Sequence, residues 1–236
     1  MFTLAHFIWL GVIGTVIAAT LFVICRTGVS HRAVGRGTML VLIALKVFHM
    51  SLSMKASPFG GYVLNQTQLS FHLCSLMIYA VIFTNLIESK RVTDVLQSFM
   101  VPCLFIGAAM ALLIPTEGVD PAKARVWQYM LIHGVLVFYG IYLAFVERVD
   151  LSFRAYRNNL KLLLCVTLVA FMMNSVLEQY KTNFLFLRVP PMKGLPILNL
   201  NNGWYVYFLS LAAVACTLVL LVHLPFIVKG AWKRHK

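Results

Sequence analysis

Long, almost uninterrupted runs of apolar residues constrain the fold of this chain more than any other feature. A helix needs about 20 mostly apolar residues to cross a bilayer. The predicted spans are residues 5–25, 38–56, 69–87, 95–114, 127–146, 160–178 and 204–227. These runs do not alternate with a period of two, so they indicate helices rather than barrel strands. The sequence predicts an all-α, polytopic membrane helix bundle of about seven transmembrane helices, forming a single transmembrane domain over residues 1–236.

The composition supports a membrane protein and leaves no apolar-poor segment for a separate soluble domain. Of the 236 residues, 61% are hydrophobic and 11% are charged, whereas about 25% of the residues in soluble domains are charged. The net charge is +13, and the Lys and Arg residues lie in short gaps between the apolar runs. This placement favours anchoring beside anionic lipid over binding of nucleic acid. We expect membrane lipids as partners and no nucleic acid, and the sequence leaves the oligomeric state open.

The distribution of basic residues predicts the orientation. If the N-terminus lies outside, thirteen Lys and Arg residues fall in inside segments and six in outside segments. Cytoplasmic loops are enriched in Lys and Arg, so we predict an outside N-terminus and a cytoplasmic C-terminus. No basic region precedes the first apolar run, which argues against a cleaved signal peptide.

Polar side chains within the predicted spans concentrate in the half of the membrane that this orientation places outside. Ionisable residues inside spans are rare and usually functional. The set comes from four spans and comprises His49, His72, Cys74, His133, Asn174 and Glu178. Their shared depth is what a membrane-embedded site near the outer leaflet requires.

Cys74 and His133 are the residue types that nucleophilic catalysis uses. A cysteine attacks as the thiolate, and a nearby histidine can accept its proton. The thiolate would attack an ester carbonyl to form an acyl-enzyme, and an alcohol, an amine or water would then take the acyl group. The competing interpretation is that Cys74 is a packing residue, that His72 only caps or orients a helix end, and that His49 and Lys46 either bind a lipid phosphate or only hydrogen-bond between helices. The five cysteines have no metal-ligand spacing, so we expect no metal and no cofactor.

Several segments, in order along the chain, resemble the YwaF family of bacterial integral membrane proteins. The segment "QLSFHLCSLMIYAVIF" resembles that family's "LPLHLC" signature, "WQYMLIHG" its "FFISHG" helix, and "NFLFLRVPP" its "NYMYLRRKP" loop. The resemblance covers roughly residues 65–228. The YwaF family in turn looks related to the transmembrane protein 164 family, whose members are regarded as membrane acyltransferases that use a Cys and a His.

The resemblance implies a role for each matching position. Cys74 matches the nucleophile, His133 the base, and His72 the other histidine of the signature. In the segment "NFLFLRVPP", Asn183 matches the asparagine of the family's loop. Arg188 in the same segment stands at a position that is usually basic in the family. Phe184 departs from the family's tyrosine. The resemblance also implies a multi-pass protein of the bacterial plasma membrane.

Three functions compete. The leading hypothesis is a lipid acyltransferase or transacylase in which His49, Asn174 and Glu178 orient His133 or hold a headgroup, and Arg188 binds phosphate. The first alternative is a lipid ester hydrolase with the same Cys and His. The second is a transporter or a non-enzymatic membrane partner subunit, which intramembrane Lys46 and His49 would suit, although the sequence has no repeated halves.

Overall fold

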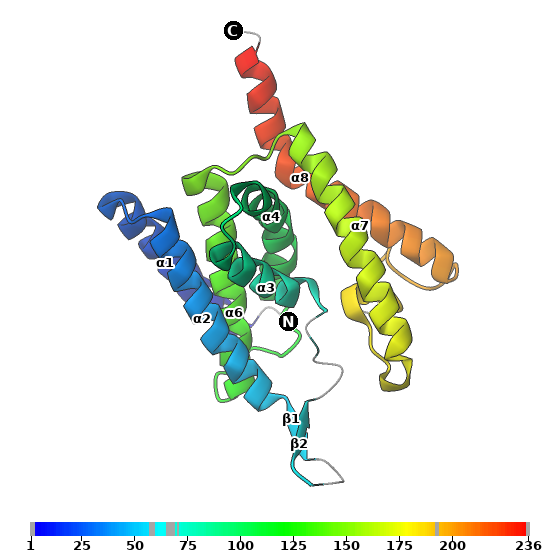
Figure 1. The fold of residues 1–236 in the computed structure, drawn as a ribbon. Coiled ribbons are helices and arrows are strands. Elements are labelled where there is room, and N and C mark those ends of the chain that lie inside the picture. Colours follow the sequence, from blue (N-terminus) through cyan, green and yellow to red (C-terminus); the bar gives the residue numbers. More distant parts are fainter. Residues whose placement is uncertain (1–2, 57–59, 65–68, 70, 192–193, 235–236) are drawn as a thin grey trace. The chain divides into compact units, whose positions relative to one another are not determined.

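The computed structural model describes residues 3–56, 60–64, 69, 71–191 and 194–234, and it is almost entirely helical (Figure 1). The α-helices are α1 (Leu4–Thr27), α2 (His31–Leu52), α3 (Leu73–Leu86), α4 (Lys90–Cys103), α5 (Met110–Leu113), α6 (Ala124–Ile141), α7 (Phe153–Val176) and α8 (Trp204–Arg234). The shorter elements are the π-helices η2 (Leu104–Ala109) and η3 (Tyr142–Glu147), the 3-10 turns η4 (Glu178–Tyr180) and η5 (Phe184–Phe186), and the paired strands β1 (Met54–Ala56) and β2 (Tyr62–Leu64). The predicted all-α fold is confirmed.

Among the described residues, six helical segments are long and apolar enough to cross a membrane. Four are α1, α2, α7 and α8. The other two are continuous through π-helical turns, at Lys90–Leu113 and Ala124–Glu147. The remaining apolar helix, α3, has 14 residues and so extends about 21 Å, against a hydrocarbon core of about 30 Å. The chain is therefore a multi-pass membrane protein, and the orientation of its termini stays a prediction.

Helix ends differ from the predicted span ends because hydropathy marks the lipid-facing stretch and not the helix itself. α2 begins at residue 31 rather than 38, and α7 at 153 rather than 160. In both cases a serine caps the helix: Ser30 accepts from the Ala33 amide and Ser152 from the Ala155 amide, as N-cap residues do.

The structure corrects the predicted positions of two candidate site residues. His72 precedes α3 instead of lying in its first turns, and Glu178 lies in η4, beyond the end of α7.

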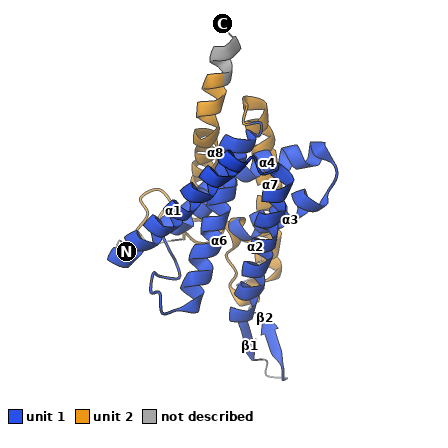
Figure 2. Ribbon diagram, turned by 90° about the vertical axis from the view of Figure 1, so that its left-hand side faces the viewer, with its two compact units in different colours: residues 1–63, 74–150 blue, residues 64–73, 151–236 orange. Residues whose placement is uncertain are grey.

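The contacts within the chain separate two compact units, drawn in different colours in Figure 2. Unit 1 comprises residues 1–63 and 74–150, and unit 2 comprises residues 64–73 and 151–236. The single domain predicted from the sequence stays a prediction.

In unit 1, α6 is the central helix and packs against α1, α2 and η2. Gly140 permits the approach of α6 to η2, because a Cβ at this position would lie 3.0 Å from the Leu104 Cβ. The residues around this contact form the core: Met100, Leu104, Leu136 and Tyr139 have no exposed surface. A rigid core around α6 therefore holds the side chains that α6 directs inward.

In unit 2, α7 and α8 pack against each other, and the segment between them folds back onto them. Phe184 and Leu187 are buried against Ala170 of α7. The Trp204 indole N–H of α8 donates to the Leu187 carbonyl at 2.9 Å. The long apolar loop thus forms part of the core of unit 2.

Candidate functional site

His133 lies on the inner face of α6, with 8% of its surface exposed. Its Nδ1 lies 2.7 Å from the carbonyl oxygen of Tyr129, one turn earlier, and the two rings are 4.3 Å apart between centroids. A carbonyl oxygen can only accept, so Nδ1 carries the proton and donates it. In the neutral ring, Nε2 then holds the lone pair and can accept a proton.

His49 approaches the same part of α6 from α2. Its Nδ1 donates to the side-chain oxygen of Gln128 at 3.2 Å, and Gln128 is 4% exposed. His49 and His133 are close enough to interact electrostatically. The structure therefore brings together His49 and His133, which the sequence placed at one depth without fixing their lateral separation.

Cys74 occupies the first turn of α3 and is partly buried. It is close enough to Tyr129 of α6 and to Cys103, the last residue of α4, to interact with both electrostatically. Tyr129 thus has Cys74 in its neighbourhood and His133 against its ring. Helices α2, α3, α4 and α6 all contribute to this region of unit 1.

Arg125 and Glu117 form a charged pair near this region. The Arg125 guanidinium donates to the Leu52 carbonyl at 2.8 Å and lies 3.7 Å from the Glu117 carboxylate. Because Leu52 ends α2, this contact ties the end of α2 to the first turn of α6. The Arg125 side chain is one-third exposed.

The two asparagines proposed as supporting residues have structural contacts in unit 2. The Asn174 amide donates to the Phe184 carbonyl at 3.0 Å and accepts from the Phe184 amide at 2.8 Å. The Asn183 oxygen accepts from the amides of Arg188 and Val189, and its nitrogen donates to the Val189 carbonyl at 2.9 Å. Both side chains therefore shape the loop between α7 and α8.

Glu178, Arg188 and His72 also have their contacts in unit 2. The Arg188 guanidinium lies 3.3 Å from the Glu178 carboxylate, which is 75% exposed. The His72 ring packs edge-on against Phe184, with 5.4 Å between ring centroids, and near Phe186 at 6.0 Å. A role for these three side chains or the two asparagines in binding substrate stays a prediction.

Two polar residues of this region, Gln128 and Tyr129, were not predicted from the sequence. Tyr129 could have been found, because residues four apart on a helix lie on one face. Gln128 meets His49 only through the packing of α2 against α6, which no local pattern encodes.

A second polar cluster lies at the opposite end of the helices of unit 1 and was also not predicted. His31 Nδ1 lies 3.1 Å from the Glu147 carboxylate and 3.2 Å from the Tyr142 hydroxyl, and its Nε2 lies 3.0 Å from the Gln97 amide nitrogen. The cluster joins the start of α2 to α4 and to η3. These polar contacts hold the start of α2 in place, so we assign the cluster a structural role.

The model of the TMEM164 family matches residues 1–223 of the chain. Searches among curated proteins and among solved structures found no match. The matched segment includes Cys74, His133 and every other residue considered above. The family match supports the resemblance to the transmembrane protein 164 family, while the resemblance to the YwaF family stays a prediction.

Proposed function

The chain belongs to the TMEM164 family, and from that premise we propose that it is a membrane acyltransferase that moves a fatty acyl chain between glycerolipids. In this proposal Cys74 is the nucleophile and His133 is the base. The observation that carries it is the hydrogen bond from His133 Nδ1 to the Tyr129 carbonyl. That bond leaves Nε2 of His133 as the proton acceptor. The ring of His133 contacts Tyr129, and Tyr129 is close enough to Cys74 to interact with it electrostatically.

The proposed reaction has two halves. First, His133 Nε2 takes the Cys74 proton, and the thiolate attacks the ester carbonyl of the donor lipid. The tetrahedral intermediate collapses to a thioester, and the departing lysolipid oxygen takes the proton back from His133. Second, His133 deprotonates the hydroxyl of an acceptor lipid, which attacks the thioester. The sulfur leaves and recovers the proton from His133, so that the enzyme returns to its starting state.

Neighbouring groups suit the remaining tasks. Gln128 fixes the ring of His49, whose Nε2 then accepts a hydrogen bond from a hydroxyl group of the acceptor lipid. Arg125 of α6 is held against the end of α2, and the planar array of N–H donors of its guanidinium matches the oxygens of a phosphate. We place the reaction near the outer leaflet of a bacterial plasma membrane, on the basis of the predicted orientation and the YwaF resemblance.

Hydrolysis is the alternative outcome of the same chemistry, with water in place of the acceptor lipid. Product analysis separates the two activities. An acylated acceptor lipid identifies a transferase, and a free fatty acid without acylated acceptor identifies a hydrolase.

Purified protein in vesicles that contain phospholipid with a labelled acyl chain and an unlabelled lysophospholipid tests the proposal. We expect label on the acceptor with the native protein and at least 100-fold less with Cys74→Ala. Cys216→Ala is the matched control, because Cys216 is also a partly buried thiol in an apolar helix. Equal transfer by Cys74→Ala and the native protein would overturn the assignment.

A further inference from the structure

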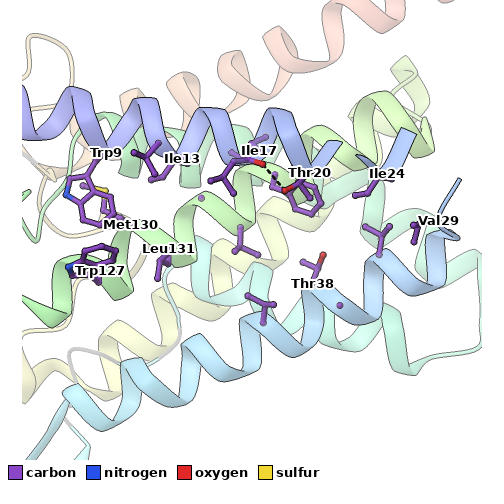
Figure 3. A pocket seen from close by; sticks show the side chains of 18 of the residues that line it. Trp9, Ile13, Ile17, Thr20, Ile24, Val29, Thr38, Trp127, Met130 and Leu131 are labelled. Carbon is purple, nitrogen blue, oxygen red and sulfur yellow. Dashed lines mark hydrogen bonds between the residues drawn. The ribbon is translucent and has the colours of Figure 1, made fainter. Parts of the chain in front are cut away.

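An apolar groove runs between α1, α2 and α6 within unit 1 (Figure 3), and its volume is about 470 Å³. Trp9 and Trp127 lie at one end, and Ile24 and Val29 lie at the other. Three of the four polar side chains in its lining are already bonded. The indole N–H groups of Trp9 and Trp127 donate to the carbonyls of Val119 and Pro121, and the Thr20 hydroxyl donates to the Val16 carbonyl. The groove therefore offers almost nothing to a polar ligand.

We propose that this groove holds a single hydrocarbon chain of a membrane lipid. Its length follows from α1, on which Trp9 and Ile24 both line it. Fifteen residues at 1.5 Å each give about 22 Å. The volume of about 470 Å³ is spread along this length between three helices, so the groove is elongated. An elongated groove with an almost entirely apolar lining matches the shape and chemistry of an unbranched hydrocarbon chain.

The groove is accessible from the side that faces hydrocarbon. Val12, Val16 and Val41 line it, and their exposed fractions are 53%, 58% and 47%. They belong to helices that are long and apolar enough to span the bilayer. A lipid chain can therefore enter sideways, without leaving an apolar medium, and burial of its surface favours binding.

The position of the groove connects it to the candidate site. Met130 and Gly134 line the groove and flank His133 on α6, Met130 one turn before it and Gly134 directly after it. From there the groove continues toward Phe138 and Ile24. Resting on the proposed function, we assign the bound chain to the acyl donor, with its carbonyl near Cys74 and His133 and its methyl end between Ile24 and Val29. The distance between these two ends then limits the length of chain that the enzyme transfers.

Gly37 provides a way to block the groove without disturbing its walls. It lines the groove from α2, and a Cβ built on it meets no atom within 4 Å. Gly37→Phe therefore places a ring in the path of the chain. Gly14→Phe is the matched control, since Gly14 lies on α1, has equally open surroundings and is not among the groove residues.

The test uses vesicles of phosphatidylcholine in which one acyl chain carries a photoactivatable diazirine near its methyl end. After illumination, mass spectrometry of peptides locates the adducts. We expect adducts on groove residues such as Ile24, Val29 and Phe138 in the native protein and in Gly14→Phe. In Gly37→Phe these adducts fall at least tenfold, while adducts on the exposed surface of α8 stay constant and report equal incorporation of the probe. Far-UV circular dichroism and the unfolding midpoint of the variant, both close to native, report that it is folded.

Val41→Trp provides a second block, from a side chain that is already half exposed, and the same loss is expected. Undiminished groove labelling in Gly37→Phe and Val41→Trp overturns the proposal, as does native labelling that favours α8 over the groove.

The Cys74→Ala variant separates this proposal from the proposed function. Labelling that persists in Cys74→Ala supports a lipid-chain site whether or not Cys74 is the nucleophile. With an active enzyme, Gly37→Phe also shifts transfer toward shorter acyl chains.

Discussion

His133 and Tyr129 are joined twice, through a 2.7 Å hydrogen bond from the imidazole Nδ1 to the backbone carbonyl and through rings whose centroids are 4.3 Å apart. The hydrogen bond fixes the tautomer and does not depend on the tyrosine side chain. The ring contact fixes the plane of the imidazole. The Tyr129 hydroxyl is used elsewhere, as a donor to the Ala111 carbonyl at 3.0 Å.

These separate contacts predict different effects for two substitutions of Tyr129. Tyr129→Phe keeps the carbonyl and the ring and loses the hydroxyl, which bonds Ala111 and also interacts with Thr116, at a cost of about 1 kcal/mol in unfolding free energy for each bond lost. Tyr129→Ala also frees the imidazole to rotate, and misplacement of a catalytic group by 1 Å can cost about 100-fold in rate. We expect near-native acyl transfer for the Phe variant and at least tenfold less for the Ala variant, measured on purified protein. Equal rates for the two variants would mean that the ring contact is irrelevant.

Replacement of His133 by glutamine removes the base and keeps a polar side chain of similar length. General base catalysis contributes about 10²- to 10⁴-fold, so kcat for acyl transfer should fall by about 100-fold or more. KM should change little, because the substituted group acts on the proton and not on the bound chain. Photolabelling of the groove provides the control for lipid binding. A rise in KM with an unchanged kcat would instead identify His133 as a binding residue.

The contact between His49 and Gln128 predicts a measurable energetic coupling. His49→Leu leaves the buried oxygen of Gln128 without its donor, which costs about 1–3 kcal/mol. Gln128→Leu removes the stranded acceptor, so the double variant should be more stable than the sum of the single variants predicts, by about 1 kcal/mol. Unfolding free energies of the four proteins in detergent measure this coupling. Additive effects would show that the hydrogen bond does not contribute to stability.

In unit 2, Asn174 holds the loop between α7 and α8 through both polar atoms of its amide. Asn174→Leu leaves the buried N–H of Phe184 unpaired, at a cost of about 1–3 kcal/mol, and leaves the Phe184 carbonyl, among the described residues, with only the Leu187 amide, at 3.3 Å, as a donor. Amide hydrogen exchange should therefore accelerate at residues 184–187. Glu178→Gln serves as the control, since exposed ion pairs contribute at most about 1 kcal/mol and Glu178 is 75% exposed. Unchanged exchange in Asn174→Leu would show that loop packing alone holds the segment.

The sequence predicted the helical spans well, because the bilayer requires long apolar runs and such runs are visible without any tertiary information. It predicted helix ends less well. The first turns of α2 and α7 carry His31, Arg32 and Arg154, which lower hydropathy although the helix continues. The caps at Ser30 and Ser152 are local signals that could have placed both starts.

The candidate site was predictable in depth and only partly in composition. Counting along helices placed His49, Cys74 and His133 at one level. In unit 1 His49 lies within electrostatic range of His133, and Cys74 within that of Tyr129, whereas a catalytic pairing of Cys74 with His133 stays a prediction. The same counting included Asn174 and Glu178, whose contacts in the structure are to loop residues of unit 2. Depth follows from position along one helix, whereas the partner of a side chain follows from how helices pack, and the sequence records only the first.

Detection of an acyl group bound to Cys74 is the most direct test of the claim that Cys74 is the nucleophile of an acyltransferase. Purified protein is mixed with phospholipid that carries a labelled acyl chain, quenched in acid without an acceptor lipid, and digested for mass spectrometry. The account predicts the acyl mass on the peptide that contains Cys74, its release by hydroxylamine, and its slower formation in His133→Gln. Acyl transfer that proceeds at the native rate in Cys74→Ala, or a thioester that forms on a different cysteine, would contradict it.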